Sequence, residues 1–126
     1  MDAAVKAGVT GLYLQDLGDH PVAPGVPTHS LAGLTAIGAI VREAFPELTL
    51  GVCFMSHGAR EPLAAAQAIG AQFVRLKVYV GVMVKAEGLL QGCAYEAIQY
   101  RAQIGAEDVA ILADIYDRTG APLGPM

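Results

Sequence analysis

Apolar residues fall into four short runs along the chain, and longer stretches with helical spacing separate them. The runs occupy residues 8–14, 49–55, 72–80 and 109–116. Most of them are nearly continuous in apolar side chains, which is typical of parallel strands covered by helices rather than of half-exposed antiparallel strands. The pattern therefore predicts four strands of a parallel sheet.

The stretches between these runs predict helices over residues 28–45, 59–69 and 94–104. In the first stretch the apolar positions follow the helical repeat, at Leu31, Leu34, Ile37, Val41 and Phe45. Glycine follows the second and third stretches, at Gly70 and Gly105, and glycine readily adopts the left-handed conformation that ends a helix. Because strand and helix alternate, we expect an α/β fold built from βαβ units.

Two connections are longer than a turn requires, at residues 18–27 and 81–92. We expect both to be loops that follow the carboxyl end of a strand. Ligand sites of α/β proteins gather at that end of the sheet. Polar residues in and near these loops are therefore the first candidates for a functional site.

One predicted strand carries charged residues on a single face. Side chains alternate along a strand, so Arg75, Lys77 and Tyr79 point away from the helices, and Asp114 and Tyr116 do the same on the next strand. Asp114 can therefore face Lys77. Two interpretations stay open: a structural ion pair, or a site in which Lys77 holds an anion or forms a Schiff base and Asp114 acts as a base or metal ligand. Tyr116 joins this pair as the third candidate catalytic residue.

Other polar residues lie at the ends of the predicted strands, where they would share one mouth. The candidate substrate-binding residues are Asp16, Asp19, His20, Cys53, His57, Asp117 and Arg118. The alternative is that these are solvated turn residues. No two histidines have the spacing of a known metal motif, so no metal site is predicted, and the sequence identifies no cofactor.

Composition limits the class of protein. A length of 126 residues allows one domain, and a content of 54% hydrophobic residues requires a buried core. The net charge of −4 offers no excess of cations for nucleic acid. No apolar stretch reaches the roughly 18 residues of a membrane span, and no signal peptide is recognisable, so we expect a cytoplasmic protein with Cys53 and Cys93 as buried free thiols.

Several segments, taken in order, resemble the BtpA family, whose members are TIM barrels related to the phosphate-binding barrels. The matching segments are residues 7–12, 18–21, 28–44, 50–52, 69–75, 87–92, 100–101 and 111–114. Gly18, Asp19, Gly81, Gly88 and Asp114 follow the family, which usually carries Asn at the positions of Cys53 and Lys77 and His at Tyr116. The resemblance implies a (β/α)8 barrel of which about four βα units are present, so that the chain looks like the central part of a longer barrel. Its open sheet edges would favour self-association.

The resemblance also suggests two functions. The family is named for a factor needed to accumulate photosystem I in thylakoids, and other members are encoded beside sugar-uptake genes. One implied function is therefore a part in the biogenesis of a membrane protein complex. The alternative is an enzyme that acts on a small phosphorylated, sugar-like metabolite through Lys77 and Asp114.

Overall fold

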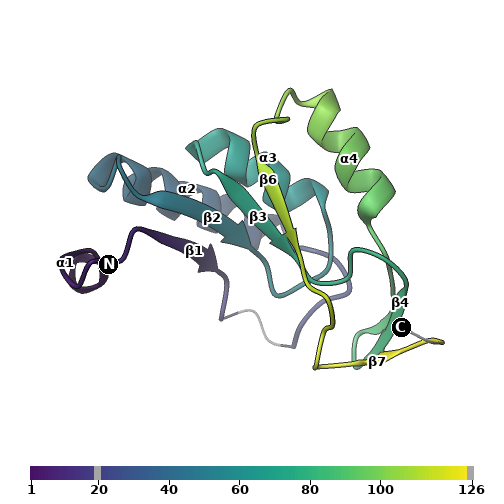
Figure 1. Ribbon diagram of the computed structural model, residues 1–126. Coiled ribbons are helices and arrows are strands. Elements are labelled where there is room, and N and C mark those ends of the chain that lie inside the picture. The colour runs from purple at the N-terminus through teal and green to yellow at the C-terminus, as the bar shows by residue number, and fades with distance from the viewer. Residues whose placement is uncertain (19–20, 125–126) are drawn as a thin grey trace.

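A four-stranded parallel sheet forms the centre of the structure, a computed structural model that describes residues 1–18 and 21–124 (Figure 1). Its strands lie side by side in the order of the sequence: β1 (Gly11–Gln15), β2 (Thr49–Cys53), β3 (Phe73–Leu76) and β6 (Ala110–Ala113). All three pairings are parallel, which confirms the prediction from the apolar runs. Each strand is shorter than the run that predicted it, and β1 begins three residues later than its run and extends to Gln15.

Helices connect these strands and cover one face of the sheet (Figure 1). They are α2 (Thr28–Ala44), α3 (Arg60–Ile69) and α4 (Ala94–Gln103), and a short helix, α1 (Asp2–Lys6), precedes β1. α2 contacts β1, α3 contacts β2 and β3, and α4 packs against α3. The predicted left-handed glycines are confirmed, with φ of 72° at Gly70 and 69° at Gly105. In the described part of the chain, no helix is long and apolar enough to cross a membrane.

The core lies between the sheet and α3. Leu50, Val52 and Val74 point from the strands toward the helices and are fully buried. Leu63 and Ala66 of α3 meet them and are also fully buried. Burying a side chain of the size of leucine or valine stabilises the fold by roughly 1.5–3 kcal/mol, so this layer is the main source of stability.

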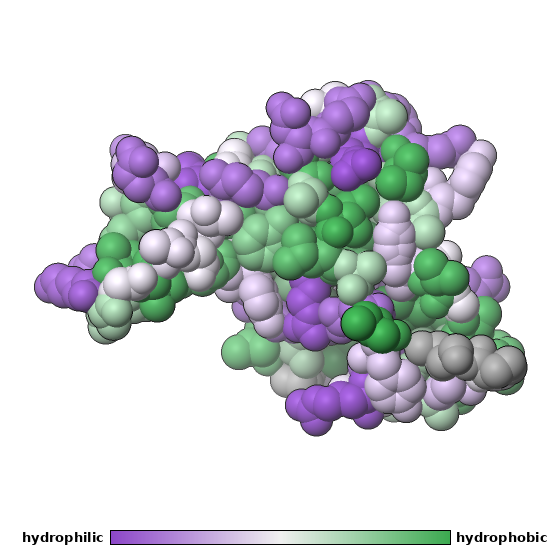
Figure 2. All heavy atoms as spheres, viewed as in Figure 1, coloured by the Kyte–Doolittle hydropathy of each residue, from purple (hydrophilic) through white to green (hydrophobic). Residues whose placement is uncertain are grey.

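The opposite face of the sheet carries no helix among the described residues. Figure 2 shows hydrophobic side chains spread over this face, interrupted by a hydrophilic group. Tyr13 and Leu112 lie on it and are 41% and 49% exposed. The ring of Phe73 lies directly over Gly51, where a Cβ atom would come within 2.2 Å of the ring, so only glycine leaves room for it. This is the face that a closed barrel would turn inward.

Residues 81–92, predicted as a loop, instead form a β-hairpin. Strands β4 (Val82–Lys85) and β5 (Gly88–Gln91) pair antiparallel, and β7 (Ala121–Pro122) pairs with the other edge of β4. Val78, Met83 and Leu90 form a second, small apolar cluster beneath it. The loop prediction was wrong because three consecutive apolar residues, Val82 to Val84, are too short a run to separate a strand from a loop. The hairpin stands next to the carboxyl ends of the main strands (Figure 1).

Candidate functional site

Two hollows lie where the hairpin meets the carboxyl ends of β2 and β3. The enclosed one has a volume of about 10 Å³, room for roughly one water molecule. The open one, here called the recess, has a volume of about 320 Å³, which falls in the range of sites for small ligands. The recess is lined by Pro21, Val22, Met55, Lys77, Lys85, Ala86, Glu87 and Thr119. The predicted end of the sheet therefore does carry a hollow, and Lys77 lies on its wall.

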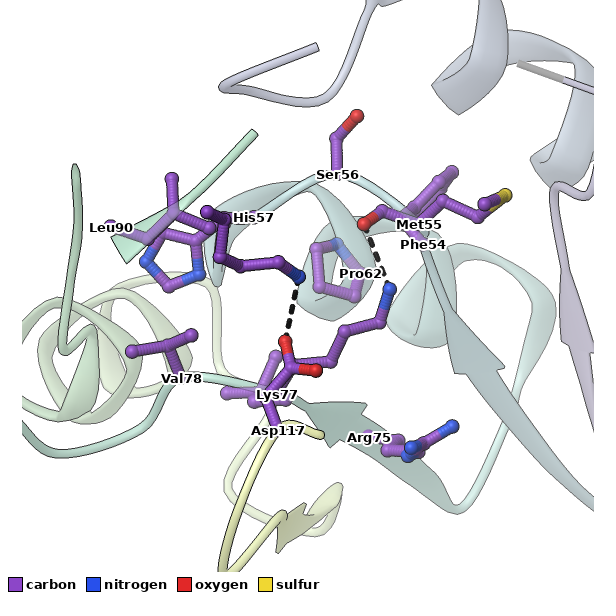
Figure 3. A pocket seen from close by; sticks show the side chains of 13 residues that line it. Phe54, Met55, Ser56, His57, Pro62, Arg75, Lys77, Val78, Leu90 and Asp117 are labelled. Carbon is purple, nitrogen blue, oxygen red and sulfur yellow. Dashed lines mark hydrogen bonds and ion pairs between the residues drawn. The ribbon is translucent and has the colours of Figure 1, made fainter. Parts of the chain in front are cut away.

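Lys77 follows β3 and lines both hollows. Its Nζ donates a hydrogen bond to the carbonyl oxygen of Met55 at 2.8 Å, and Figure 3 shows the side chain reaching toward Met55. Burial is the main cause that lowers the pKa of Lys77 below its ordinary value. The positive charges of Lys85 and Arg75 act in the same direction. Lys77 is therefore a half-buried cation whose hydrogen-bond partner is neutral.

Asp114 does not pair with Lys77, so this expectation was wrong. Its two carboxylate oxygens accept hydrogen bonds from Nε and Nη2 of Arg75, both at 2.9 Å. The fork of the guanidinium matches the two oxygens of a carboxylate, whereas an ammonium offers only a point charge. Arg75 also donates to the hydroxyl of Tyr13 at 3.1 Å, and in Figure 3 it points away from Lys77. Hydrogen bonding to Asp114 raises the pKa of Arg75, so this pair stays charged.

Asp117 has a partner that the sequence did not indicate, Lys85 of the hairpin. Nζ of Lys85 lies 2.7 Å from Oδ2 of Asp117, and both side chains are over 90% buried. Thr119 donates to Oδ1 through its main-chain N–H at 3.0 Å and its hydroxyl at 2.6 Å. Burial alone raises the pKa of Asp117, but the hydrogen bonds from Lys85 and Thr119 outweigh it and lower the pKa to about 2. The pair therefore joins the hairpin to the segment after β6.

Two further predicted residues connect elements at this end of the sheet, and a third is buried there. Oδ1 of Asp16 accepts a hydrogen bond from the N–H of Met55 at 2.8 Å, which joins the ends of β1 and β2. Nε2 of His57 lies 2.6 Å from the carbonyl oxygen of Gln91 in the hairpin. Cys53 is fully buried at the end of β2, and burial raises the pKa of its thiol. Cys53 and Cys93 are both free and buried, as predicted.

The remaining predicted residues lie apart from the recess or outside the described chain. Tyr116 is 51% exposed, its hydroxyl donates to the carbonyl oxygen of Gly120 at 3.4 Å, and it is not part of the lining. Arg118 is exposed. Asp19 and His20 lie outside the described residues. The roles proposed for these four residues stay predictions.

Lys85, Glu87 and Thr119 line the recess but were not among the predicted site residues. All three depend on the hairpin and its contact with the chain after β6. The only signal for them was the short apolar run of residues 82–84 followed by Glu87-Gly88, which can form a strand and a tight turn.

Comparison with known proteins agrees with the fold. The sequence profile of the BtpA family matches residues 1–126. The photosystem I biogenesis protein BtpA of Synechocystis sp. is 30% identical over 122 residues, which cover 97% of this chain and 42% of that protein. An uncharacterized mitochondrial protein of Caenorhabditis elegans is 30% identical, with coverage of 95% and 45%. An uncharacterized protein of Pyrococcus furiosus is 28% identical, with coverage of 88% and 42%.

The chain thus spans less than half the length of these relatives. No solved structure matches it. The family has the TIM-barrel fold, and four parallel strands in sequence order, with helices on one face, are what a part of such a barrel contains. The family profile matches the whole sequence, and the fold agrees with it. The chain therefore belongs to the BtpA family.

Proposed function

We propose that the barrel to which this chain belongs binds a small anionic metabolite in the recess, with Lys77 as the cation that contacts it. The main support for the proposal is that Lys77, unlike the neighbouring Arg75 and Lys85, has a neutral hydrogen-bond partner rather than a carboxylate. Arg75 is paired with Asp114 and Lys85 with Asp117, whereas Lys77 bonds a neutral carbonyl oxygen. An uncompensated, half-buried ammonium is costly, and an anion in the recess would offset that cost.

The rest of the lining favours a phosphorylated, sugar-like ligand. Glu87 and the hydroxyl of Thr119 lie on the wall and can accept hydrogen bonds from ligand hydroxyl groups. Val22 and the side chain of Met55 give an apolar surface against which a carbon skeleton can pack. A few polar groups on a partly apolar wall are typical of a metabolite site.

A sugar phosphate should therefore raise the unfolding temperature of this chain, and Lys77→Met should lose most of that effect. Loss of a charge-assisted hydrogen bond weakens binding by about 1.5–3 kcal/mol, which corresponds to at least about tenfold in Kd. The measurement is thermal unfolding with increasing concentrations of glucose 6-phosphate and of glucose. Glucose serves as the matched ligand without the anion.

Lys6→Met is the matched control, because Lys6 is exposed on α1 and the same charge is removed. It should respond to glucose 6-phosphate as the unchanged chain does. Equal stabilisation of the Lys77→Met variant, or an equal response to glucose, would contradict a role of Lys77 as the anion-binding group.

A part in the biogenesis of a membrane protein complex is the second candidate function. It is supported by the 30% identity to the Synechocystis protein, which bears the name of a photosystem I biogenesis protein. The two candidates differ in the kind of partner, a metabolite or a protein complex. Absence of ligand stabilisation, together with co-purification of the tagged chain with a membrane protein complex, would favour this second candidate.

We also propose that this chain, on its own, associates with a second copy through its sheet edges. The outer edges of β1 and β6 have no strand partner in the described part of the chain, and two sets of four strands give the eight of a barrel. Sedimentation velocity at several protein concentrations should show a monomer–dimer equilibrium. A monomer over a hundredfold range of concentration, up to about 100 µM, would contradict it.

A further inference from the structure

The three lysines of this chain lie in three different surroundings. Lys6 is exposed on α1. Lys85 is buried and paired with Asp117 at 2.7 Å. Lys77 is half-buried at the wall of the recess, and its Nζ donates to the carbonyl oxygen of Met55 at 2.8 Å. Only Lys77 thus combines partial burial, access to an open hollow of about 320 Å³ and a neutral hydrogen-bond partner.

Two carboxylates that follow β6 are already paired with other cations, and the carboxylate on the wall of the recess itself is that of Glu87. Asp114 accepts two hydrogen bonds from Arg75. Asp117 accepts hydrogen bonds from Lys85 and Thr119. An ammonium without a matched carboxylate loses its proton more readily when it is taken out of water. The lowered pKa of Lys77 agrees with this arrangement. An amine in its neutral form carries the lone pair that a nucleophile needs.

We propose that Lys77 forms an imine with the carbonyl group of a small anionic aldehyde or ketone bound in the recess. This inference rests on the proposed function, because it assigns a chemical class and a covalent step to the ligand of the same recess. The anionic group of the ligand is attracted by the charged form of Lys77, and the carbonyl group reacts with the neutral form.

The step needs no oxidant or reductant. The lone pair of Nζ attacks the carbonyl carbon, a C–N bond forms, and the C–O π bond breaks to give a carbinolamine. The carbonyl oxygen then leaves as water with the two hydrogens of the amine, and a C=N double bond remains. The carboxylate of Glu87, which lies on the wall of the recess, can pass protons between the nitrogen and the departing oxygen. Protonation of the imine restores the positive charge beside the anion.

The experiment traps the imine with sodium borohydride in the presence of glyceraldehyde 3-phosphate, followed by peptide mapping of the modified lysines. At pH 7 Lys77 should be modified at least about tenfold faster than Lys6, because the recess holds the aldehyde next to Lys77 and not next to Lys6. Glyceraldehyde, which lacks the phosphate, should lose this preference. The rate of modification should also be measured as a function of pH for both lysines. The charged or titratable groups that act on Lys77 are Cys53, Arg75, Lys85 and Asp117. The pH profile of Lys6 serves as the reference.

The variant Lys77→Arg separates this inference from the proposed function. It keeps a cation and should retain part of the stabilisation by glyceraldehyde 3-phosphate, but trapping at position 77 should vanish. Stabilisation of the unchanged chain without modification of Lys77 would overturn the imine and leave anion binding intact. Absence of both stabilisation and trapping would overturn both proposals. Modification of Lys77 and Lys6 at equal rates would also overturn the imine, because it would show an ordinary surface amine.

Discussion

Replacing Lys85 with methionine is expected to lower the free energy of unfolding by about 3–5 kcal/mol, a large part of the stability of a domain of this size. Lys85 and Asp117 are over 90% buried, and their charged atoms lie 2.7 Å apart. The substitution leaves the carboxylate of Asp117 buried with only Thr119 as its hydrogen-bond donor. The measurement is equilibrium unfolding in urea by circular dichroism.

The double variant Lys85→Met with Asp117→Leu is the matched control, because it removes both charges. It should recover most of the lost stability, since two apolar side chains of similar volume replace a buried ion pair at little cost. The outcome that would contradict this is a loss of unfolding free energy in the double variant equal to the sum of the losses in Lys85→Met and Asp117→Leu. It would show that the pair stabilises the fold through the shape of its side chains rather than through charge.

The same pair should make the stability depend on pH in acid. The pKa of Asp117 in the folded chain is about 2, below its ordinary value of 3.8. The stabilisation is therefore fully present above about pH 4 and is lost as the pH falls toward 2. The double variant should lack this part of the acid dependence.

Replacing Leu63 with alanine should lower the free energy of unfolding by about 2–5 kcal/mol. Leu63 is fully buried where α3 meets β2 and β3, so truncation opens a cavity in the main core. The control is Leu17→Ala, because Leu17 is 69% exposed and should change the stability by no more than about 0.5 kcal/mol. Similar small effects of both substitutions in urea unfolding would contradict the position of the core.

The main sheet could be predicted from the sequence because each of its strands is a local pattern. The apolar runs mark the strands without knowledge of their partners, and the glycines that follow two helices mark the starts of β3 and β6. The same alternation placed Arg75 correctly on the face away from the helices, where it bonds Tyr13, whereas Lys77 follows the end of the strand. The alternation could not show whether Arg75 or Lys77 binds Asp114. The guanidinium of Arg75 offers two donors that match the carboxylate, and Lys77 bonds a main-chain carbonyl oxygen of Met55 instead. Neither feature can be read from a pattern of apolar and polar residues.

The hairpin explains most of what the sequence did not predict about the site. Its strands are short, and the second strand that pairs with β4 is β7, which lies more than 30 residues later in the sequence. Lys85 and Glu87 reach the recess through this long-range pairing, and no local pattern encodes it. Of the eight residues that line the recess, only Lys77 was therefore among the predicted site residues.

The presence of two separate apolar clusters has a consequence for motion. Val78, Met83 and Leu90 form a cluster much smaller than the core beneath the main sheet. The hairpin can therefore open as a unit at a lower free energy than global unfolding. Because Lys85, Ala86 and Glu87 line the recess, each such opening would widen the entrance and let water reach Lys77. Amide hydrogens of β4 and β5 would exchange through these openings, while those of β2 and β3 stay protected, so that hydrogen exchange would report how often the wall of the recess moves away.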